Sequence, residues 1–342
     1  MKLAIRCNAS HSLGLGDVVC GLVLADAARS QGVEPVLIVN DEPVVDRLMQ
    51  STKHDYLTVP SGLSPARDAL MLEKVLAERR AGMLFVIRFD QDLFPYAGLK
   101  ERLGLALGCV DFWSAFPPAF DLAVNWDPTA EADYEFSAYP DTVFMLGPRF
   151  VFLKPEISGL APRKAEPAGM EKVLVTMGGT DLNGLTLPVL RALQDHQDPL
   201  QVTLVVGAGY KDHAGLREFL KTARQPIEVV ENAQDMGRLL NRADLVITAG
   251  GLTLFESLVL GRPSLAVAAV KHQEPRCREF SQRGAAVFLG CAGELKTANI
   301  TDEIDHLADH GIRQKLHAQA KVQVGDEGPA LVAGKIKEMM GQ

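Results

Sequence analysis

Short apolar runs alternate with amphipathic segments along most of this chain. Runs such as 2–7, 35–40 and 172–176 have the length of a buried strand. Each is followed by a stretch in which apolar residues recur every three or four positions, as on one face of a helix. Strands that alternate with helices predict parallel sheets with helices on both faces. The pattern therefore predicts an α/β protein.

The first half of the chain contains the following expected elements. The strands are 2–7, 35–40, 57–59 and 83–89, with 122–124 as the last short strand. The helices are 17–31, 44–50 and 65–80.

A proline-rich segment then interrupts the rhythm and predicts a connection between domains. Pro148, Pro155, Pro162 and Pro167 fall within it. The alternation restarts with strands 172–176, 201–206, 227–230, 244–248, 264–267 and 286–289. The helices between and after them are 185–194, 213–222, 233–243, 253–261, 275–283, 301–309, 312–324 and 329–340.

The two halves predict two doubly wound domains. We expect an N-terminal Rossmann-like domain over residues 1–150 and a C-terminal one over 165–342, with the last helix available to pack back on the first domain. Two such domains are expected to bind a ligand in a cleft at the carboxyl ends of their strands.

Length, charge and cysteine content exclude several classes of protein. The 342 residues suit two domains rather than one. A net charge of −8 without a basic segment argues against a nucleic-acid partner. The five cysteines are scattered and predict neither disulfides nor a metal site. No apolar run is long enough for a transmembrane segment or a signal peptide, so we expect a cytoplasmic protein.

Two glycine pairs follow strands in the second half. Gly178 and Gly179 follow 172–176, and Gly250 and Gly251 follow 244–248, directly before a helix that carries Glu256. Glycine lets backbone N–H groups approach a ligand that a Cβ would push away. A helix N-terminus adds partial positive charge. The two turns together predict a nucleoside diphosphate site.

A purely structural interpretation of the same residues stays open. Thr253 and Glu256 have the spacing of a capping box, in which the threonine caps the helix and the glutamate reaches back to the cap. Gly-Gly after a strand also suits an ordinary tight turn. Neither segment is a GxGxxG or Walker motif.

Four blocks carry a resemblance to a known superfamily. The chain resembles the GT-B superfamily, and more narrowly the UDP-sugar hydrolases of pseudaminic acid biosynthesis and related polysaccharide-biosynthesis proteins. It is more distantly similar to the N-acetylglucosaminyltransferase that forms lipid II. The blocks are Ile5–Leu24, Thr176–Leu187, Leu245–Pro263 and Val270–Gly284.

The resemblance implies a GT-B fold of two Rossmann-like domains and a UDP-sugar substrate. It implies that Glu256 holds the ribose, that Gln273 faces the sugar beside His272, and that the Met236 backbone contacts the uracil. The residues that it places at the nucleotide sugar are Gly14, Gly16, Gly178, Gly179, Thr180, Met236, Gly250, Gly251, Thr253, Glu256, His272 and Gln273.

The first loop departs from the hydrolases at the catalytic position. They have GxGH, whereas this chain has Gly14, Leu15, Gly16 and Asp17. Asp17 is thus a candidate general base, although an aspartate there also suits a helix N-cap. His11 in the same loop is a second candidate base. UDP-sugar binding carries over from the resemblance better than hydrolysis does.

These observations predict an enzyme that cleaves or transfers at the anomeric phosphate bond of a UDP-sugar, for bacterial surface glycan or nonulosonic acid biosynthesis. Hydrolysis, inverting glycosyl transfer to a sugar acceptor and a non-catalytic nucleotide-sugar-binding module all stay open. A dehydrogenase is disfavoured because GxGxxG is missing. No cofactor or metal is implied, since His306 and His310 are expected on a solvated helix face.

Overall fold

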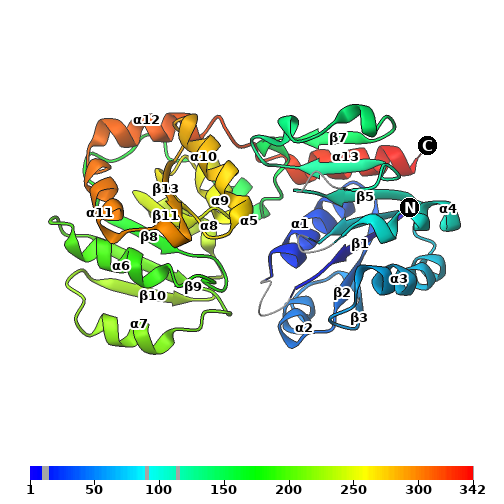
Figure 1. The fold of residues 1–342 in the computed structure, drawn as a ribbon, viewed down its shortest axis with the longest axis horizontal. Helices are drawn as coiled ribbons and strands as arrows, with labels where there is room; N and C mark the ends of the chain where they lie inside the picture. The colour runs from blue at the N-terminus through cyan, green and yellow to red at the C-terminus, as the bar shows by residue number, and fades with distance from the viewer. Residues whose placement is uncertain (10–14, 89–91, 113–115, 342) are drawn as a thin grey trace. The chain divides into compact units, whose positions relative to one another are not determined.

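Two compact units make up the protein in the computed structural model, which describes residues 1–9, 15–88, 92–112 and 116–341. Unit 1 comprises Met1–Phe152 together with Glu327–Gln342, and unit 2 comprises Leu153–Asp326. The chain therefore leaves unit 1, completes unit 2 and returns to unit 1 (Figure 1).

Unit 1 contains a seven-stranded parallel sheet in the order β3-β2-β1-β4-β5-β6-β7. Its first strand, β1, pairs with β2 on one side and β4 on the other, so the strand order reverses at this point. The strands are β1 Lys2–Cys7, β2 Glu34–Asn40, β3 Asp55–Val59, β4 Met83–Ile87, β5 Ala106–Val110, β6 Leu122–Asn125 and β7 Val143–Leu146.

The last helix of the chain, α13, belongs to unit 1, where it packs against α1, the first helix of that unit. Val332, Ala333 and Ile336 on α13 are fully buried, and the Gln31 side chain donates to the Ala330 carbonyl at 2.7 Å. The helices are α1 Gly16–Ser30, α2 Pro43–Gln50, α3 Pro65–Arg79, α4 Gly98–Leu103 and α13 Gly328–Met340, with short 3-10 turns such as η1 Phe94–Tyr96.

A buried ionic group links β1, α3 and η1 in unit 1. The Asp68 carboxylate accepts hydrogen bonds from Arg6 at 2.8 Å, Arg88 at 2.9 Å and the Tyr96 hydroxyl at 2.6 Å. Burial alone would raise the pKa of Asp68, but the two guanidinium groups and the phenol hold it below the ordinary value. Asp68 is therefore a charged anchor that fixes α3 on the sheet.

Two strands of this sheet were not predicted from the pattern. We expected 122–124 to be the last strand, whereas β5 precedes it and β7 follows it. The sequence of β5, Ala-Leu-Gly-Cys-Val, has few strongly strand-forming residues. Gly108 is needed there because an added Cβ would lie 2.5 Å from the Phe85 ring. The side chain of the neighbouring strand, and not a local preference, thus accounts for the glycine in β5.

Unit 2 contains a six-stranded parallel sheet in the order β10-β9-β8-β11-β12-β13. Its first strand, β8, again lies between the second strand of the unit and a later one. The strands are β8 Lys172–Thr176, β9 Gln201–Val206, β10 Ile227–Glu231, β11 Leu245–Ala249, β12 Ser264–Ala268 and β13 Val287–Cys291.

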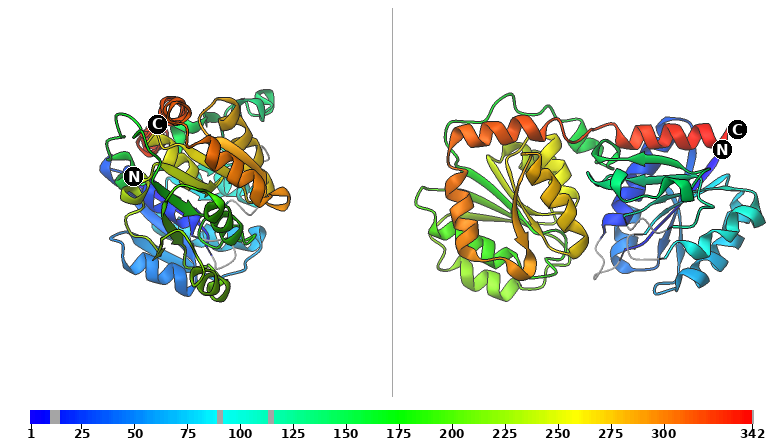
Figure 2. Two further views of the ribbon diagram at one scale, coloured as in Figure 1. Left: turned by 90° about the vertical axis from the view of Figure 1, so that its left-hand side faces the viewer. Right: turned by 45° about the horizontal axis from the view of Figure 1, so that its top comes forward.

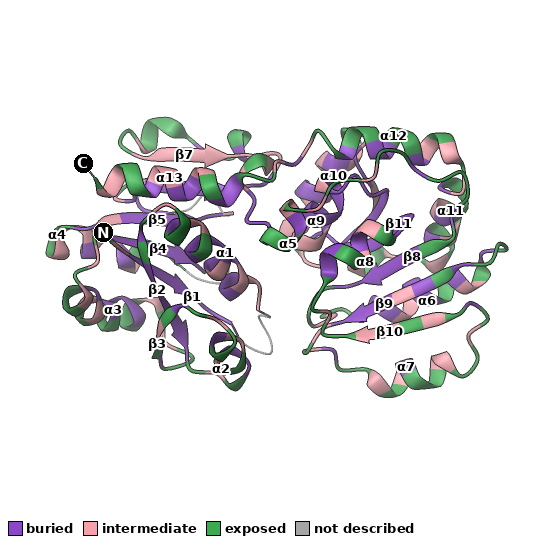
Figure 3. Ribbon diagram, turned by 180° about the vertical axis from the view of Figure 1, so that it is seen from behind, coloured by how far each residue is buried: buried purple, intermediate pink, exposed green. Residues whose placement is uncertain are grey.

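Helices cover both faces of the second sheet (Figure 2). On one face α6 contacts both α7 and α11. On the other, α8 contacts β8, α9 contacts β11 and β12, and α10 contacts β12 and β13. The sheet's centre is buried, whereas the edge strand β10 is partly exposed (Figure 3). The helices are α5 Pro155–Ser158, α6 Thr186–Asp195, α7 His213–Leu220, α8 Met236–Arg242, α9 Leu252–Val259, α10 Glu274–Gln282, α11 Thr297–His306 and α12 His310–Ala320.

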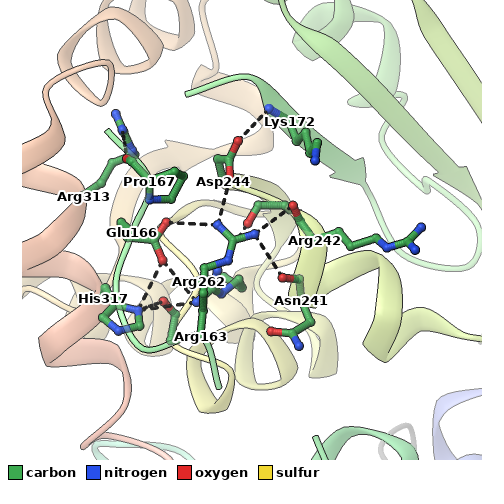
Figure 4. Close-up of polar contacts among 12 residues, drawn as sticks. Arg163, Glu166, Pro167, Lys172, Asn241, Arg242, Asp244, Arg262, Arg313 and His317 are labelled. Atoms are coloured by element: carbon green, nitrogen blue, oxygen red, sulfur yellow. Dashed lines mark hydrogen bonds and ion pairs between the residues drawn. The ribbon is translucent and has the colours of Figure 1, made fainter. Parts of the chain in front are cut away.

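A second buried ionic cluster lies at the amino ends of β8, β11 and β12 (Figure 4). Glu166 lies 3.1 Å from Arg262 and 3.3 Å from the His317 ring, and Arg163 pairs with Asp244 at 2.8 Å. Burial raises the pKa of Glu166 and lowers that of Arg262 to about 10. The cluster fastens the proline-rich segment to the edge of the sheet opposite the strand ends where ligands bind in such folds.

The pair His306 and His310 does not share a helix face as expected. Helix α11 ends at His306 and α12 begins at His310, with Asp309 capping α12 through the Ile312 N–H. The break agrees with the two separate helices expected at 301–309 and 312–324, so it is only the shared face of the two histidines that the structure contradicts. Among the described residues, no group of three or more His, Cys, Asp or Glu side chains could hold a metal ion.

Candidate functional site

The predicted glycine turns of unit 2 lie at the carboxyl ends of neighbouring strands. Gly178 and Gly179 follow β8, and Gly250 and Gly251 follow β11, which pairs with β8. The strand order reverses at β8, because β9 extends the sheet on the other side. Ligands of doubly wound folds bind outside the strand ends at such a reversal.

The turn after β8 is exposed and has a glycine-specific backbone. Gly178 has a φ of +80°, a value that favours glycine, and an added Cβ on Gly179 would meet no atom within 4 Å. The turn also packs tightly against the loop after β9, because an added Cβ on Gly207 would lie 2.5 Å from the Gly179 Cα. The Gly209 N–H donates to the Gly179 carbonyl at 3.0 Å, which fixes that peptide.

Asp181 and Asn183 continue this turn into α6. The Asp181 carboxylate accepts the N–H groups of Leu185 at 2.7 Å and Thr186 at 3.0 Å, and so satisfies donors at the start of the helix. The Asn183 side-chain amide donates to the carbonyl of Ala269 at the end of β12. The loops after β8 and β12 are thereby joined across the end of β11.

The turn after β11 is buried on one side. An added Cβ on Gly250 would lie 2.4 Å from the Cys277 sulfur, so α10 leaves room only for glycine there. Gly251 is the N-cap of α9 and uses no side chain for it. The expected capping box is therefore wrong, because Thr253 is not the N-cap. The N-cap is Gly251, which has an extended backbone, and the helix begins at Leu252, so Thr253 lies inside the first turn.

Glu256 is a buried carboxyl group on α9. Its residue is 8% exposed, and burial raises the pKa of its carboxyl, with Lys154 and the Thr253 side chain acting in the opposite direction. A helix residue that only needed a polar contact could remain exposed at lower cost. The position therefore favours a specific partner over a structural cap.

Gln273 lies beside the Gly250 turn, in the 3-10 turn η5 Lys271–Gln273. Its Oε1 accepts the Ala269 N–H at 3.0 Å, so its Nε2 is left as a donor. That nitrogen is 3.9 Å from the position of an added Cβ on Gly251. His272 precedes it and is half-buried. Gln273 can thus donate to an acceptor held at the turn.

Met236 begins α8 and has a buried side chain with 9% exposure. Asp235 caps this helix by accepting the Arg238 N–H at 3.0 Å. The side chain accordingly packs inward, a common role for methionine because its flexible side chain fills irregular gaps in a core. Only its backbone is available for the uracil contact that the resemblance implies.

The candidate base Asp17 lies in the first turn of α1 in unit 1. Leu15 is the N-cap, so the N-cap interpretation of Asp17 is wrong, and its carboxylate lies one position inside the helix that begins at Gly16. The side chain is buried, with 9% exposure. An acidic group in the first turn is favoured by the helix dipole. His11 and Gly14 lie outside the described residues.

Three residues at this edge were missed from the sequence. Gly207 and Gly209 approach the β8 turn, and Arg276 on α10 donates to the Gly250 carbonyl at 2.8 Å. The sequence Gly207-Ala208-Gly209 directly after a predicted strand was a usable signal for the first two. No local pattern distinguishes Arg276 from the exposed arginines around it.

Comparison with known proteins agrees with this architecture. Residues 172–327 match the glycosyltransferase family 28 C-terminal domain. A crystal structure of Acinetobacter baumannii MurG superposes with a TM-score of 0.71 over 99% of this chain and all of that one, at 15% identity. The chain has the GT-B fold. The two Rossmann-like parallel-sheet domains expected from the sequence are confirmed.

Curated relatives match parts of this GT-B chain. The spore coat polysaccharide biosynthesis protein SpsG of Bacillus subtilis is 25% identical over 199 residues, 57% of this chain and 58% of that protein. The UDP-N-acetylglucosamine–N-acetylmuramyl-(pentapeptide) pyrophosphoryl-undecaprenol N-acetylglucosamine transferase of Desulforudis audaxviator is 36% identical over 129 residues, 34% of this chain and 35% of that enzyme. The chain thus matches about half the length, or less, of these relatives.

The described part of this GT-B chain contains no helix with the length and apolar character needed to cross a membrane.

Proposed function

We propose that the protein is a glycosyltransferase whose unit 2 binds a UDP-sugar donor. The observation that carries the proposal is the pair of glycine turns at the ends of the adjacent strands β8 and β11, with buried Glu256 one turn into α9. The match of residues 172–327 to a glycosyltransferase domain supports it independently.

The two turns offer backbone donors suited to a diphosphate. In the part of the chain that the structure describes, the N–H groups of Thr180 and Gly251 donate to no acceptor. Such N–H groups, with the N-terminus of α9, favour a phosphate group. We expect Glu256 to accept hydrogen bonds from ribose hydroxyls and Gln273 to donate a hydrogen bond to the sugar. The remaining candidates, His272 and the backbone of Met236, stay predictions.

A glycine substitution tests this without damaging the fold. Gly179→Ala adds a methyl group into open space at a φ that alanine accepts, so the unfolding free energy should be unchanged or rise by about 0.4–1 kcal/mol. The methyl group should nevertheless obstruct the diphosphate, and the UDP affinity measured by calorimetry should fall at least about tenfold. Gly293→Ala, also in open space but away from the turns, is the control.

Full UDP affinity in Gly179→Ala would contradict the proposed site. A wild-type protein that binds neither UDP nor UDP-N-acetylglucosamine would refute the proposed function itself.

The reaction that follows donor binding is the attack of an acceptor on the anomeric carbon, with UDP as the leaving group. In an inverting transferase a base takes the proton of the acceptor hydroxyl. Asp17 is our candidate for this base. Asp17→Asn should then lower turnover by about 10²–10⁴ while UDP affinity is kept. Full turnover in this variant would exclude Asp17 as the base.

The relatives' names favour transfer over hydrolysis. SpsG is named for polysaccharide biosynthesis and the Desulforudis enzyme for N-acetylglucosamine transfer. We therefore propose an amino-sugar nucleotide as donor and a surface glycan precursor as acceptor, with UDP-N-acetylglucosamine as the first probe. Release of free sugar from this probe without an acceptor would instead support a UDP-sugar hydrolase, the activity that the resemblance to the pseudaminic acid enzymes implies. Binding without any turnover would support a nucleotide-sugar-binding module.

A further inference from the structure

Arg276 is a buried cation directly behind the β11 turn. It lies in α10, its residue is 5% exposed, and its Nη1 donates to the Gly250 carbonyl at 2.8 Å. Its guanidinium carbon lies 5.0 Å from the centre of the Phe255 ring on α9. The side chain thus joins α10, α9 and the peptide between them, and its orientation is set by packing as well as by hydrogen bonding.

The hydrogen bond to Gly250 has a consequence for the next residue. In a trans peptide the C=O and the following N–H point in opposite directions. A donor that fixes the Gly250 carbonyl therefore also fixes the direction of the Gly251 N–H. The same logic applies at the β8 turn, where the Gly209 N–H holds the Gly179 carbonyl and thereby directs the Thr180 N–H.

We propose that Arg276 is the positioning residue of the diphosphate site. It does not touch the ligand; it orients the Gly250–Gly251 peptide so that the Gly251 N–H is directed at the diphosphate. Its positive charge also polarises this peptide, and a preoriented donor needs no reorganisation when the anion binds. This inference rests on the proposed donor site in unit 2.

The close packing of α10 against Gly250 further restricts the position of the Gly250–Gly251 peptide. The Cys277 sulfur, one residue after Arg276, fills the space of a Cβ on Gly250, so α10 holds the turn both by this contact and by the hydrogen bond from the guanidinium group. A neutral side chain at position 276 could fill the same volume but would leave the Gly250 carbonyl without its charged donor.

The experiment compares UDP with uridine, which lacks the diphosphate, on the full-length protein. Arg276→Met keeps an unbranched side chain against Phe255 but removes the donor and the charge. UDP affinity should fall by about tenfold or more, and uridine affinity measured by NMR titration should stay within about twofold. Arg276→Lys restores a charged donor with poorer geometry and should recover part of the UDP affinity.

Arg278→Met is the matched control. Arg278 lies two residues further along α10, is exposed, and pairs with Glu274 at 2.6 Å. Its replacement should leave the affinities for both ligands unchanged.

Three outcomes overturn the inference. The first is an unchanged UDP affinity in Arg276→Met. The second is an equal loss of UDP and uridine affinity in this variant, which would indicate a merely structural residue. The third is an Arg276→Lys variant that recovers none of the UDP affinity. If Arg276→Met does not fold, the ratio of UDP to uridine affinity in Arg276→Lys decides, because only a positioning role lowers this ratio. A wild-type protein that does not bind UDP refutes the proposed function, which is a different result from any of these.

Discussion

Replacing Glu256 by glutamine should stabilise the protein and weaken nucleotide binding at the same time. The buried carboxyl has a pKa raised by burial, so folding favours its neutral form. A raised pKa contributes stability that is fully present below the unfolded value of about 4.3 and is lost as the pH rises through the folded-state value. Glutamine resembles the neutral acid at every pH.

The expected size follows from proton linkage. For each unit by which the folded pKa exceeds the unfolded one, the wild type loses about 1.4 kcal/mol of stability at pH 8 relative to glutamine. For a domain of the size of unit 2, this corresponds to a Tm difference of about 3–6 °C. The difference should shrink toward zero near pH 4.5. UDP affinity should fall in the variant by about 1.5–3 kcal/mol at pH 8, because ribose hydroxyls lose a charged acceptor.

Thermal unfolding of both proteins between pH 4.5 and 8, with UDP calorimetry at pH 8, measures these effects. Glu218→Gln is the control, since Glu218 is exposed and pairs only with Lys221 among the described residues. This control should show little change in Tm at any pH. A Glu256→Gln variant that is less stable than the wild type at pH 8 would refute the reasoning about burial. Unchanged UDP affinity would refute the ribose role.

Two further substitutions probe the frame of the site. Gly207→Ala places a Cβ 2.5 Å from the Gly179 backbone, which cannot rotate away, so urea unfolding should show a loss of about 1–3 kcal/mol together with weaker UDP binding. Wild-type stability in this variant would contradict the close contact. Glu166→Ala removes the carboxylate 3.1 Å from buried Arg262 and should cost about 3–5 kcal/mol, measured in the same way. Because Glu166 lies at the opposite edge of the sheet, the folded variant should bind UDP normally, and weakened binding would show that the cluster affects the site.

The sequence was most informative where local pattern and final structure agree. The strands 172–176 and 201–206 were predicted with both bounds correct, because branched apolar residues follow one another between polar loops. The glycine pairs were found for the same reason, since each follows such a strand directly. The start of α9 was misplaced by one residue because the capping-box spacing of Thr253 competes with a glycine cap that has no side-chain signature.

Contacts between distant segments could not be predicted. Gly207 approaches Gly179, and Arg276 reaches Gly250, only after the sheet has assembled. The glycines after β9 mark a turn in the sequence, but nothing in the sequence shows which distant segment either residue contacts. The strand β5 belongs to the same class, because Gly108 is explained by the Phe85 ring on the neighbouring strand. In each case the residue type is set by a neighbour that is remote in the chain.

The return of the chain to unit 1 affects the order in which the protein can be completed on the ribosome. Unit 2 is a contiguous segment, whereas unit 1 lacks α13 until the last residues emerge. At ordinary translation speeds the synthesis of unit 2 takes roughly ten seconds or more. During this time the surface of α1 on which α13 later packs is uncovered. The N-terminal part of the nascent chain is thus exposed to chaperones and to aggregation for longer than the part made after it.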